Sequence, residues 1–107
     1  MSLLEPFGAP QNVNGHNSSS TRIRVSWEEV PVVQRNGIIT KYTVTYWSLT
    51  ENHIENVTFT GNPPALTGEI TGLREYVEYN ITVFGTTVKG DGPHSSAIVV
   101  RTDQDSK

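Results

Sequence analysis

Strict alternation of polar and apolar residues is the feature that most constrains how this chain can fold. Residues 22–27 read Arg-Ile-Arg-Val-Ser-Trp, residues 41–47 read Lys-Tyr-Thr-Val-Thr-Tyr-Trp, and residues 79–84 read Tyr-Asn-Ile-Thr-Val-Phe. Successive side chains of a β-strand point to opposite faces, so a period of two predicts strands with one buried face. The three segments therefore indicate a β protein built from half-buried strands.

Four weaker segments complete the predicted set of strands. They cover residues 11–15, 55–60, 66–72 and 97–102, and turn-forming residues separate them at 36–37, 61–64, 72 and 90–93. Short strands divided by frequent turn signals are typical of an all-β sandwich or barrel. No segment requires a helix.

One set of inward-facing residues follows from this alternation. A chain of 107 residues is near the usual size of one domain and has room for a single core. We expect two sheets about 10 Å apart to enclose that core. Its predicted members are Val13, Ile23, Val25, Trp27, Tyr42, Val44, Tyr46, Ile70, Leu73, Tyr79, Ile81, Val83 and Val99.

Several motifs then occur in an order and spacing that resemble the fibronectin type III family. They are Ala9-Pro10, the segment 26–31 (Ser-Trp-Glu-Glu-Val-Pro), the segment 36–46, Leu73 followed by Tyr79, and the glycine-rich run 90–95. The resemblance covers residues 9–102. It implies an all-β, seven-stranded antiparallel sandwich of immunoglobulin-like, Greek-key type.

The resemblance also assigns structural roles to four residues. Trp27 would fill the core at the end of the second strand, and Tyr42 would lie in the third strand. Leu73 and Tyr79 would form a tyrosine corner, in which a buried ring anchors one sheet and its hydroxyl bonds to the backbone upstream. The chain departs from the family between these two residues, since Glu75, Tyr76 and Val77 replace the usual Pro-Gly and Thr.

The ends of the chain read as linkers. Residues 1–8 are interpreted as an expression start, Met1-Ser2-Leu3, followed by a linker, and they lack the character of a signal peptide. The domain proper is expected to span residues 9–102. Residues 103–107 would lead to a neighbouring module.

Composition argues against several classes of function. The net charge is -3 and the basic residues are scattered, which disfavours nucleic acid and an anionic membrane as partners. Cysteine is absent from the sequence, so disulfides and thiolate sites are absent too. His16, His53 and His94 fall in three separate predicted loops. We therefore expect no catalytic residues, no metal and no cofactor, and we do not interpret the domain as an enzyme.

Lys89-Gly90-Asp91 is a candidate integrin-type motif in the loop before the last strand. A cation and a carboxylate held apart by glycine could serve in such recognition. The alternative is simpler, because Gly90 and Gly92 supply the conformations that a tight turn requires. We favour turn chemistry over ligand binding for this loop.

Three acceptor sequences for N-glycosylation are present, at Asn17, Asn56 and Asn80. Asn17 is expected in a loop, and alternation places Asn56 and Asn80 on the outward faces of strands. All three would then be accessible, which favours a secreted or cell-surface protein.

Trp47 and Phe84 are predicted on the outward face of neighbouring strands, which makes them a candidate partner surface. Large aromatic side chains on a solvated face suggest a covering group. A neighbouring domain, a protein ligand or a glycan could each provide it, and the default alternative is an isolated exposed aromatic side chain packed against Thr and Lys neighbours. Trp47 is also expected beside Asn80 as a direct or diagonal cross-strand neighbour.

The sequence thus favours a non-catalytic interaction or spacer module of an extracellular adhesion, guidance or receptor-phosphatase protein. Its partners would be neighbouring domains of the same chain and a protein ligand, and the isolated domain would be monomeric. Three alternatives remain: an intracellular muscle-type module, a cytokine-receptor-like domain and a carbohydrate-binding sandwich. The second is disfavoured because residues 93–96 read Pro-His-Ser-Ser where a Trp-Ser-x-Trp-Ser box would stand.

Overall fold

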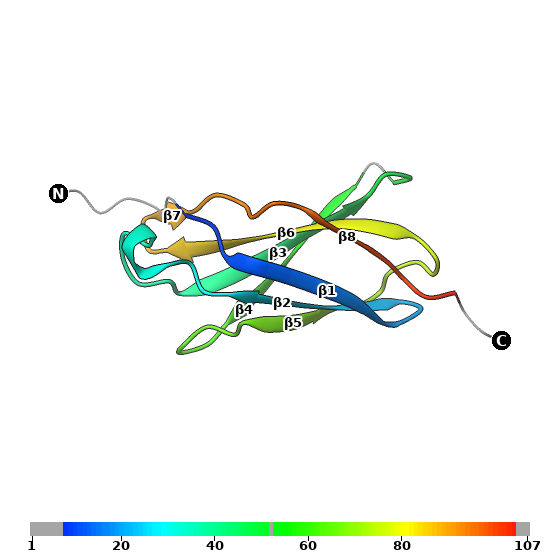
Figure 1. Cartoon of the computed structure of the whole chain (residues 1–107), viewed down its shortest axis with the longest axis horizontal. Helices are drawn as coiled ribbons and strands as arrows, with labels where there is room; N and C mark the ends of the chain where they lie inside the picture. Colours follow the sequence, from blue (N-terminus) through cyan, green and yellow to red (C-terminus); the bar gives the residue numbers. More distant parts are fainter. Residues whose placement is uncertain (1–7, 52, 105–107) are drawn as a thin grey trace.

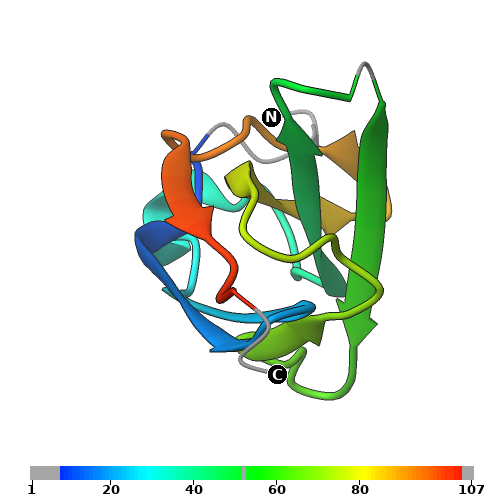
Figure 2. The ribbon, with the colours of Figure 1, turned by 90° about the vertical axis from the view of Figure 1, so that its right-hand side faces the viewer.

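Two antiparallel β-sheets packed face to face make up the fold (Figure 1). The computed structural model describes residues 8–51 and 53–104, so the predicted terminal linkers lie mostly outside the described residues. The first sheet has the order β1-β2-β5, formed by Gln11–Ser19, Arg22–Glu28 and Thr67–Ile70. Figure 2 shows this sheet as a layer separate from the second one.

The second sheet is larger and is built around β6. Its order is β4-β3-β6, and both β7 and β8 pair with the free side of β6. The strands are β3 (Lys41–Ser48), β4 (Ile54–Thr60), β6 (Glu78–Thr87), β7 (Gly90–Asp91) and β8 (Ile98–Arg101). A short 3-10 helix, η1 (Val32–Gln34), lies in the connection from β2 to β3. The predicted all-β antiparallel sandwich is confirmed.

Trp27 lies between the sheets at the centre of an aromatic cluster. Its ring centroid is 5.9 Å from that of Tyr42 and 5.9 Å from that of Phe59. Gly68 on β5 makes room for this cluster, because a Cβ atom there would overlap the Phe59 ring. The Trp27 indole nitrogen is buried and has no hydrogen-bond partner among the described residues. Its contribution is therefore packing volume rather than a polar contact.

Aliphatic side chains from both sheets surround the cluster. In β2 the burial alternates at every residue, as expected for a strand with one core face. The buried apolar set is Ile23, Val25, Trp27, Val30, Ile39, Tyr42, Val44, Ile70, Leu73, Tyr79, Ile81, Val83 and Val100.

Two tyrosine hydroxyls tie the connections between the sheets to the core. The Tyr42 hydroxyl accepts a hydrogen bond from the Val30 backbone N–H at 3.1 Å, in the connection from β2 to β3. The Tyr79 hydroxyl accepts one from the Arg74 backbone N–H at 3.0 Å, in the connection from β5 to β6. The second bond is the arrangement expected of a tyrosine corner.

Tyr76 adopts a backbone conformation that its side chain disfavours. Its φ of 55° lies in the left-handed region, at the position where the resembled family carries glycine. Surrounding contacts hold it there. The Tyr76 N–H donates to the Asp103 carbonyl at 3.0 Å, and the Arg101 guanidinium lies 4.8 Å from the ring centroid. Buried Thr102 closes the same turn, donating to the Arg74 carbonyl at 2.7 Å.

The prediction that Val99 faces the core is wrong, because its neighbour Val100 takes that place. Val100 is 8% exposed and Val99 is 59% exposed. The register explains the exchange, since Val100 lies opposite the inward-facing Tyr79 and Val99 lies opposite the outward-facing Asn80. A run of adjacent apolar residues carries no alternation from which to decide between the two faces.

The predicted glycine-rich loop contains a short strand. Gly90 and Asp91 of β7 pair with Thr87 and Thr86 at the end of β6. Residues 92–97 then run beside β6 without forming a regular strand. The Gly92 N–H donates to the Gly85 carbonyl and the Ser95 N–H to the Val83 carbonyl, both at 2.8 Å. β7, residues 92–97 and β8 thus follow one another along the side of β6 that faces away from β3.

We predict that Trp27→Ala lowers the free energy of unfolding by about 3–5 kcal/mol, because it leaves a cavity between the sheets. Tyr79→Phe should cost about 1–3 kcal/mol, because the part-buried Arg74 N–H loses its acceptor. Equilibrium denaturation in urea measures both. Midpoints that match the wild-type chain would contradict the assigned core.

We also predict a loss of stability at alkaline pH that depends on Tyr42. Burial raises the pKa of Tyr42 above its usual 10.0, and the Val30 N–H opposes this only partly. The neutral phenol is therefore favoured in the folded state. Its contribution should be complete below about pH 10 and should disappear as the pH rises through the folded pKa, because the unfolded chain loses the proton first.

Urea midpoints measured from neutral to strongly alkaline pH test this dependence, with Tyr42→Phe as the control. The variant should be less stable at neutral pH, since it cannot accept the hydrogen bond, but its midpoint should fall less steeply above about pH 10. Burial also raises the pKa of Tyr46, which remains in both proteins. Equal slopes for the two proteins would contradict the role of Tyr42.

Candidate functional site

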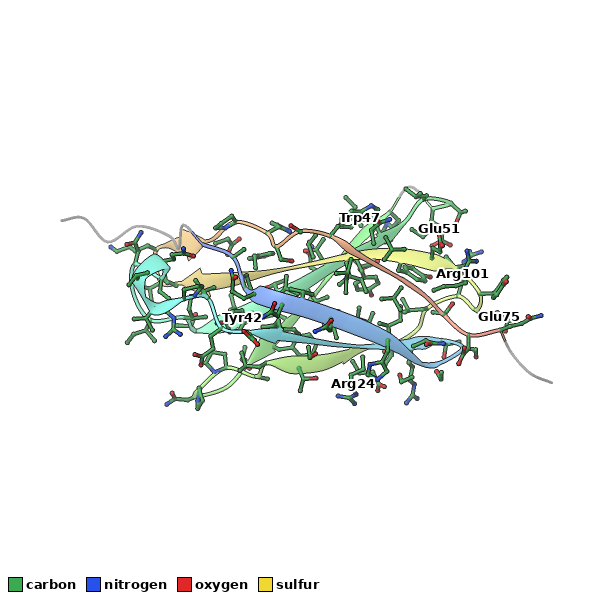
Figure 3. All side chains as sticks on the ribbon, in the orientation of Figure 1. Arg24, Tyr42, Trp47, Glu51, Glu75 and Arg101 are labelled. Carbon is green, nitrogen blue, oxygen red and sulfur yellow. The ribbon has the colours of Figure 1, made fainter. Side chains whose placement is uncertain are left out.

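The outward face of the β4-β3-β6-β8 sheet carries a row of mainly apolar side chains near one end of the strands. Trp47 lies opposite Ile54 on one side and Asn80 on the other, and Asn80 lies opposite Val99. We call these four residues the Trp47 row. Ile54 is 62% exposed and Val99 is 59% exposed, while Trp47 and Asn80 are half-buried. Figure 3 shows Trp47 near the end of β3, on the far side of the molecule from β1, β2 and β5.

A row of threonines follows the Trp47 row on the same face. Thr45 and Thr82 lie opposite each other, and Asn56 lies beyond Thr45 on β4. The Thr45 hydroxyl donates to Asn56 Oδ1 at 2.6 Å. The Thr82 hydroxyl lies 2.8 Å from His94 Nδ1. Each buried hydroxyl thus has a partner, which explains how these polar side chains are tolerated at low exposure.

Phe84 does not form one patch with Trp47. It lies opposite Thr43, four residues before Trp47 on β3, which corresponds to about 13 Å along the strand. Its ring is also partly covered, since the His94 ring centroid lies 4.6 Å away. The two aromatic residues of the predicted partner surface are therefore separate features of the same sheet.

The three glycosylation acceptors differ in their surroundings. Asn17 was expected in a loop, and this prediction is wrong, because it lies within β1 opposite Ile23 and is half-buried. Its strand face is the inner one, since a Cβ at Gly15 would touch Val100 and Ile98. Asn56 is exposed and lies on the edge strand β4. Asn80 lies in the middle of the Trp47 row.

The Lys89-Gly90-Asp91 loop is fixed by hydrogen bonds to the end of β6. Asp91 Oδ1 accepts a hydrogen bond from the Thr86 hydroxyl at 2.8 Å, and the Lys89 N–H donates to the Thr87 hydroxyl at 3.2 Å. Gly90 has a φ of 142°, which a residue with a side chain rarely adopts. Both glycine and aspartate thus have local structural roles in this turn.

The three histidines lie apart in the structure. His16 is on β1 rather than in a loop, His53 precedes β4 and pairs with Glu55, and His94 packs on Phe84. Within residues 8–51 and 53–104, no three His, Cys, Asp or Glu side chains are close enough to share a metal ion. No helix in that same part of the chain has the length and apolar character to cross a membrane.

A shallow cleft beside Trp47 brings charged side chains together at the end of the sandwich. Arg74 forms an ion pair with Glu51, and His53 Nε2 contacts the Glu55 carboxylate. These four side chains are exposed or partly exposed, and each has a partner beside the cleft. The cleft therefore presents paired polar side chains to the solvent beside Trp47.

An exposed aliphatic patch at the opposite end of the molecule was missed by sequence reasoning. Val32, Val33, Ile38 and Val88 are between 73% and 86% exposed. They come from the connection between β2 and β3 and from the turn after β6, which meet where Gly37 approaches Thr87. We call them the entry patch, because Gly8 packs beside Gln34 of η1 at this end. The adjacent valines after Pro31, outside any alternating segment, are the sequence signal that could have revealed it.

Comparisons with known proteins agree on one family. The sequence model described as the fibronectin type III domain matches residues 8–101. The chain is 38% identical over 101 residues to receptor-type tyrosine-protein phosphatase F of Mus musculus, and 35% identical over 100 residues to tyrosine-protein phosphatase Lar of Drosophila melanogaster. Each match covers 94% of this chain but only 5% of the relative, so the chain spans about one-twentieth of these proteins.

Solved structures show the same similarity. The FN5 domain of Drosophila Lar superposes with a TM-score of 0.76 at 32% identity, covering 94% of this chain and 99% of that domain. The third fibronectin III domain of human KIAA0343 superposes with a TM-score of 0.86 at 30% identity, covering 99% and 90%.

We predict that Asp91→Ala leaves cell attachment to the immobilised domain unchanged, because this carboxylate serves the turn. Stability should fall by about 1 kcal/mol, since the Thr86 hydroxyl loses its acceptor. Thr86→Val is the matched control for that loss. Attachment that requires divalent cations and disappears in Asp91→Ala but not in Thr86→Val would contradict the prediction.

Proposed function

Because the chain belongs to the fibronectin type III family, we propose that it is a non-catalytic interaction and spacer module in the extracellular part of a larger adhesion or receptor protein. Residues 9–102 form the module, and the flanking residues connect it to its neighbours. The observation that carries the proposal is the course of the chain through the fold.

The chain passes from one end of an elongated molecule to the other. The principal extents are 57 × 26 × 19 Å, and the strands run roughly along the long axis. Gly8 packs beside Gln34 of η1 at one end, and the chain runs on from β8 toward the opposite end (Figure 1). Modules with this geometry can be joined in series without reversing the chain, and each adds its length to the assembly.

The entry patch supports a contact with a preceding module. Its four exposed aliphatic side chains come from the connection between β2 and β3 and from the turn after β6, at the end where Gly8 packs beside Gln34. Clustered exposed apolar residues usually mark a surface that another protein covers. Contacts between successive domains of one chain are small and partly polar, so a few exposed aliphatic side chains are enough to supply their apolar part.

The relatives favour the cell surface as the setting. They include receptor-type phosphatases and, at 30% identity, protein sidekick-2 of Gallus gallus. By analogy with them, the parent of this module is a receptor or adhesion protein, and a receptor-type tyrosine phosphatase is the specific form that we favour. Any phosphatase activity would reside in another domain of that parent.

We predict that antibodies raised against the folded chain label intact cells that make the parent protein. Brief protease treatment of those cells should remove the label, because the module would face the medium. An antibody against a cytosolic protein, reactive only after permeabilisation, controls for cell integrity. Labelling that appears only after permeabilisation would instead support the intracellular muscle-type alternative.

A further inference from the structure

We propose that Asn80 carries an N-linked glycan whose core sugars lie on the Trp47 row and close this face to protein partners. The inference rests on the proposed function, because a glycan of this kind is added only to chains that enter the secretory pathway. The proposal makes Asn80 a modification site and identifies the glycan as the group that covers the exposed apolar side chains of the Trp47 row.

Asn80 is the acceptor whose position suits this role. It lies in the second sheet between Trp47 and Val99, and its side chain points away from the core because its neighbours Tyr79 and Ile81 point inward. None of the hydrogen bonds formed by the described residues uses the Asn80 side chain. The amide is therefore available on the outward face.

The other two acceptors are placed differently. Asn17 is half-buried on the inner face of β1. Asn56 is outward but lies one row further along the sheet, and its Oδ1 already accepts the Thr45 hydroxyl. A sugar on Asn56 would lie beside the free edge of β4, whereas a sugar on Asn80 that follows the surface of the sheet would lie over the Trp47 row.

The surroundings of Asn80 match the apolar face of a sugar ring. Cross-strand neighbours have Cβ atoms about 5 Å apart, so Trp47 and Val99 both lie within reach of the first sugar. Ile54, which is 62% exposed, continues the row beyond Trp47. The nearest strand pair beyond the row, Glu78 and Arg101, is a mutually neutralised ion pair at 2.9 Å. A neutral ligand with C–H groups on one face and hydroxyls on the other is compatible with this environment.

The reaction is a transfer of a preassembled oligosaccharide from a polyisoprenyl diphosphate donor. The Asn80 Nδ2 atom forms a bond to the anomeric carbon of the first N-acetylglucosamine. The bond between that carbon and the diphosphate oxygen breaks, one amide proton is released, and the lipid diphosphate leaves. The hydroxyl of Thr82, two residues later, completes the acceptor sequence read by the transferase.

Expression of the chain behind a secretory leader in animal cells tests occupancy. Site-resolved mass spectrometry of the secreted wild-type chain should show a glycan at Asn80. Asn80→Gln should remove one glycan, and Asn56→Gln, its matched control, should retain the one at Asn80. A secreted chain with Asn80 unmodified would overturn the inference, and a glycan at Asn56 in that chain would leave the proposed function intact.

Quenching of tryptophan fluorescence by acrylamide tests the position of the sugar. Trp27 is 4% exposed and changes little, so quenching reports on Trp47. Compared with bacterially produced chain, the glycosylated wild type and Asn56→Gln should show a lower quenching constant and emission shifted to shorter wavelength. Asn80→Gln from animal cells should behave like the bacterial protein.

Two other outcomes would overturn the assignment. Equal quenching of the glycosylated and bacterial chains would mean that the sugar projects into solvent. Protection of Trp47 in bacterial protein that sedimentation shows to be dimeric would identify a second copy as the occupant. Both outcomes are independent of antibody labelling of intact cells, so failure here is distinguishable from failure of the proposed function.

Discussion

The packing of Trp27 between the two sheets is the interaction on which the rest of the structure depends. Its indole contacts Tyr42 from the second sheet and Phe59 from the edge strand β4, and Gly68 leaves the space that the Phe59 ring occupies. The volume at this point sets the separation of the sheets, because protein interiors are close-packed and tolerate few voids. The hydroxyls of Tyr42 and Tyr79 then fix two of the three connections that cross between the described sheets, those from β2 to β3 and from β5 to β6.

The two faces of the second sheet therefore differ, because only the inward face packs against Trp27 and the first sheet. Inward residues supply the packing, so the outward residues of β3 and β6 are free to vary in chemistry. Threonines with partnered hydroxyls fill most of that face, which leaves the Trp47 row and the His94–Phe84 pair as its distinct features. Both features consist of side chains that lie beside each other on the surface of the sheet. The outer face thus presents shape and apolar area, and the chain enters and leaves the fold at the two ends of the sandwich.

Alternation predicted an all-β sandwich or barrel and most of the core, because half-buried strands expose every second residue. The resemblance to the fibronectin type III family narrowed this to one kind of sandwich, and the two together placed Trp47 beside Asn80, which the register shows as direct partners. Alternation failed where the period-two signal was absent. The run Ile98-Val99-Val100 carries no polar marker of its face, and Asn17 lies in a strand whose residues are mostly polar. The covering of Phe84 by His94 depends on how a loop returns to the sheet, which local sequence does not encode.

The exit of the chain at the end opposite its entry has a mechanical consequence. A pull on the two ends acts nearly parallel to the strands, so the hydrogen bonds between strands are loaded in shear and must yield together. The two terminal strands are not equally held. β1 is paired with β2 along most of its length, whereas β8 is paired with β6 over four residues and is preceded by an irregular segment. Under tension β8 should therefore detach from its sheet before β1 does. The contacts of Thr102 and Arg101 with the turn at Tyr76 add to the attachment of β8.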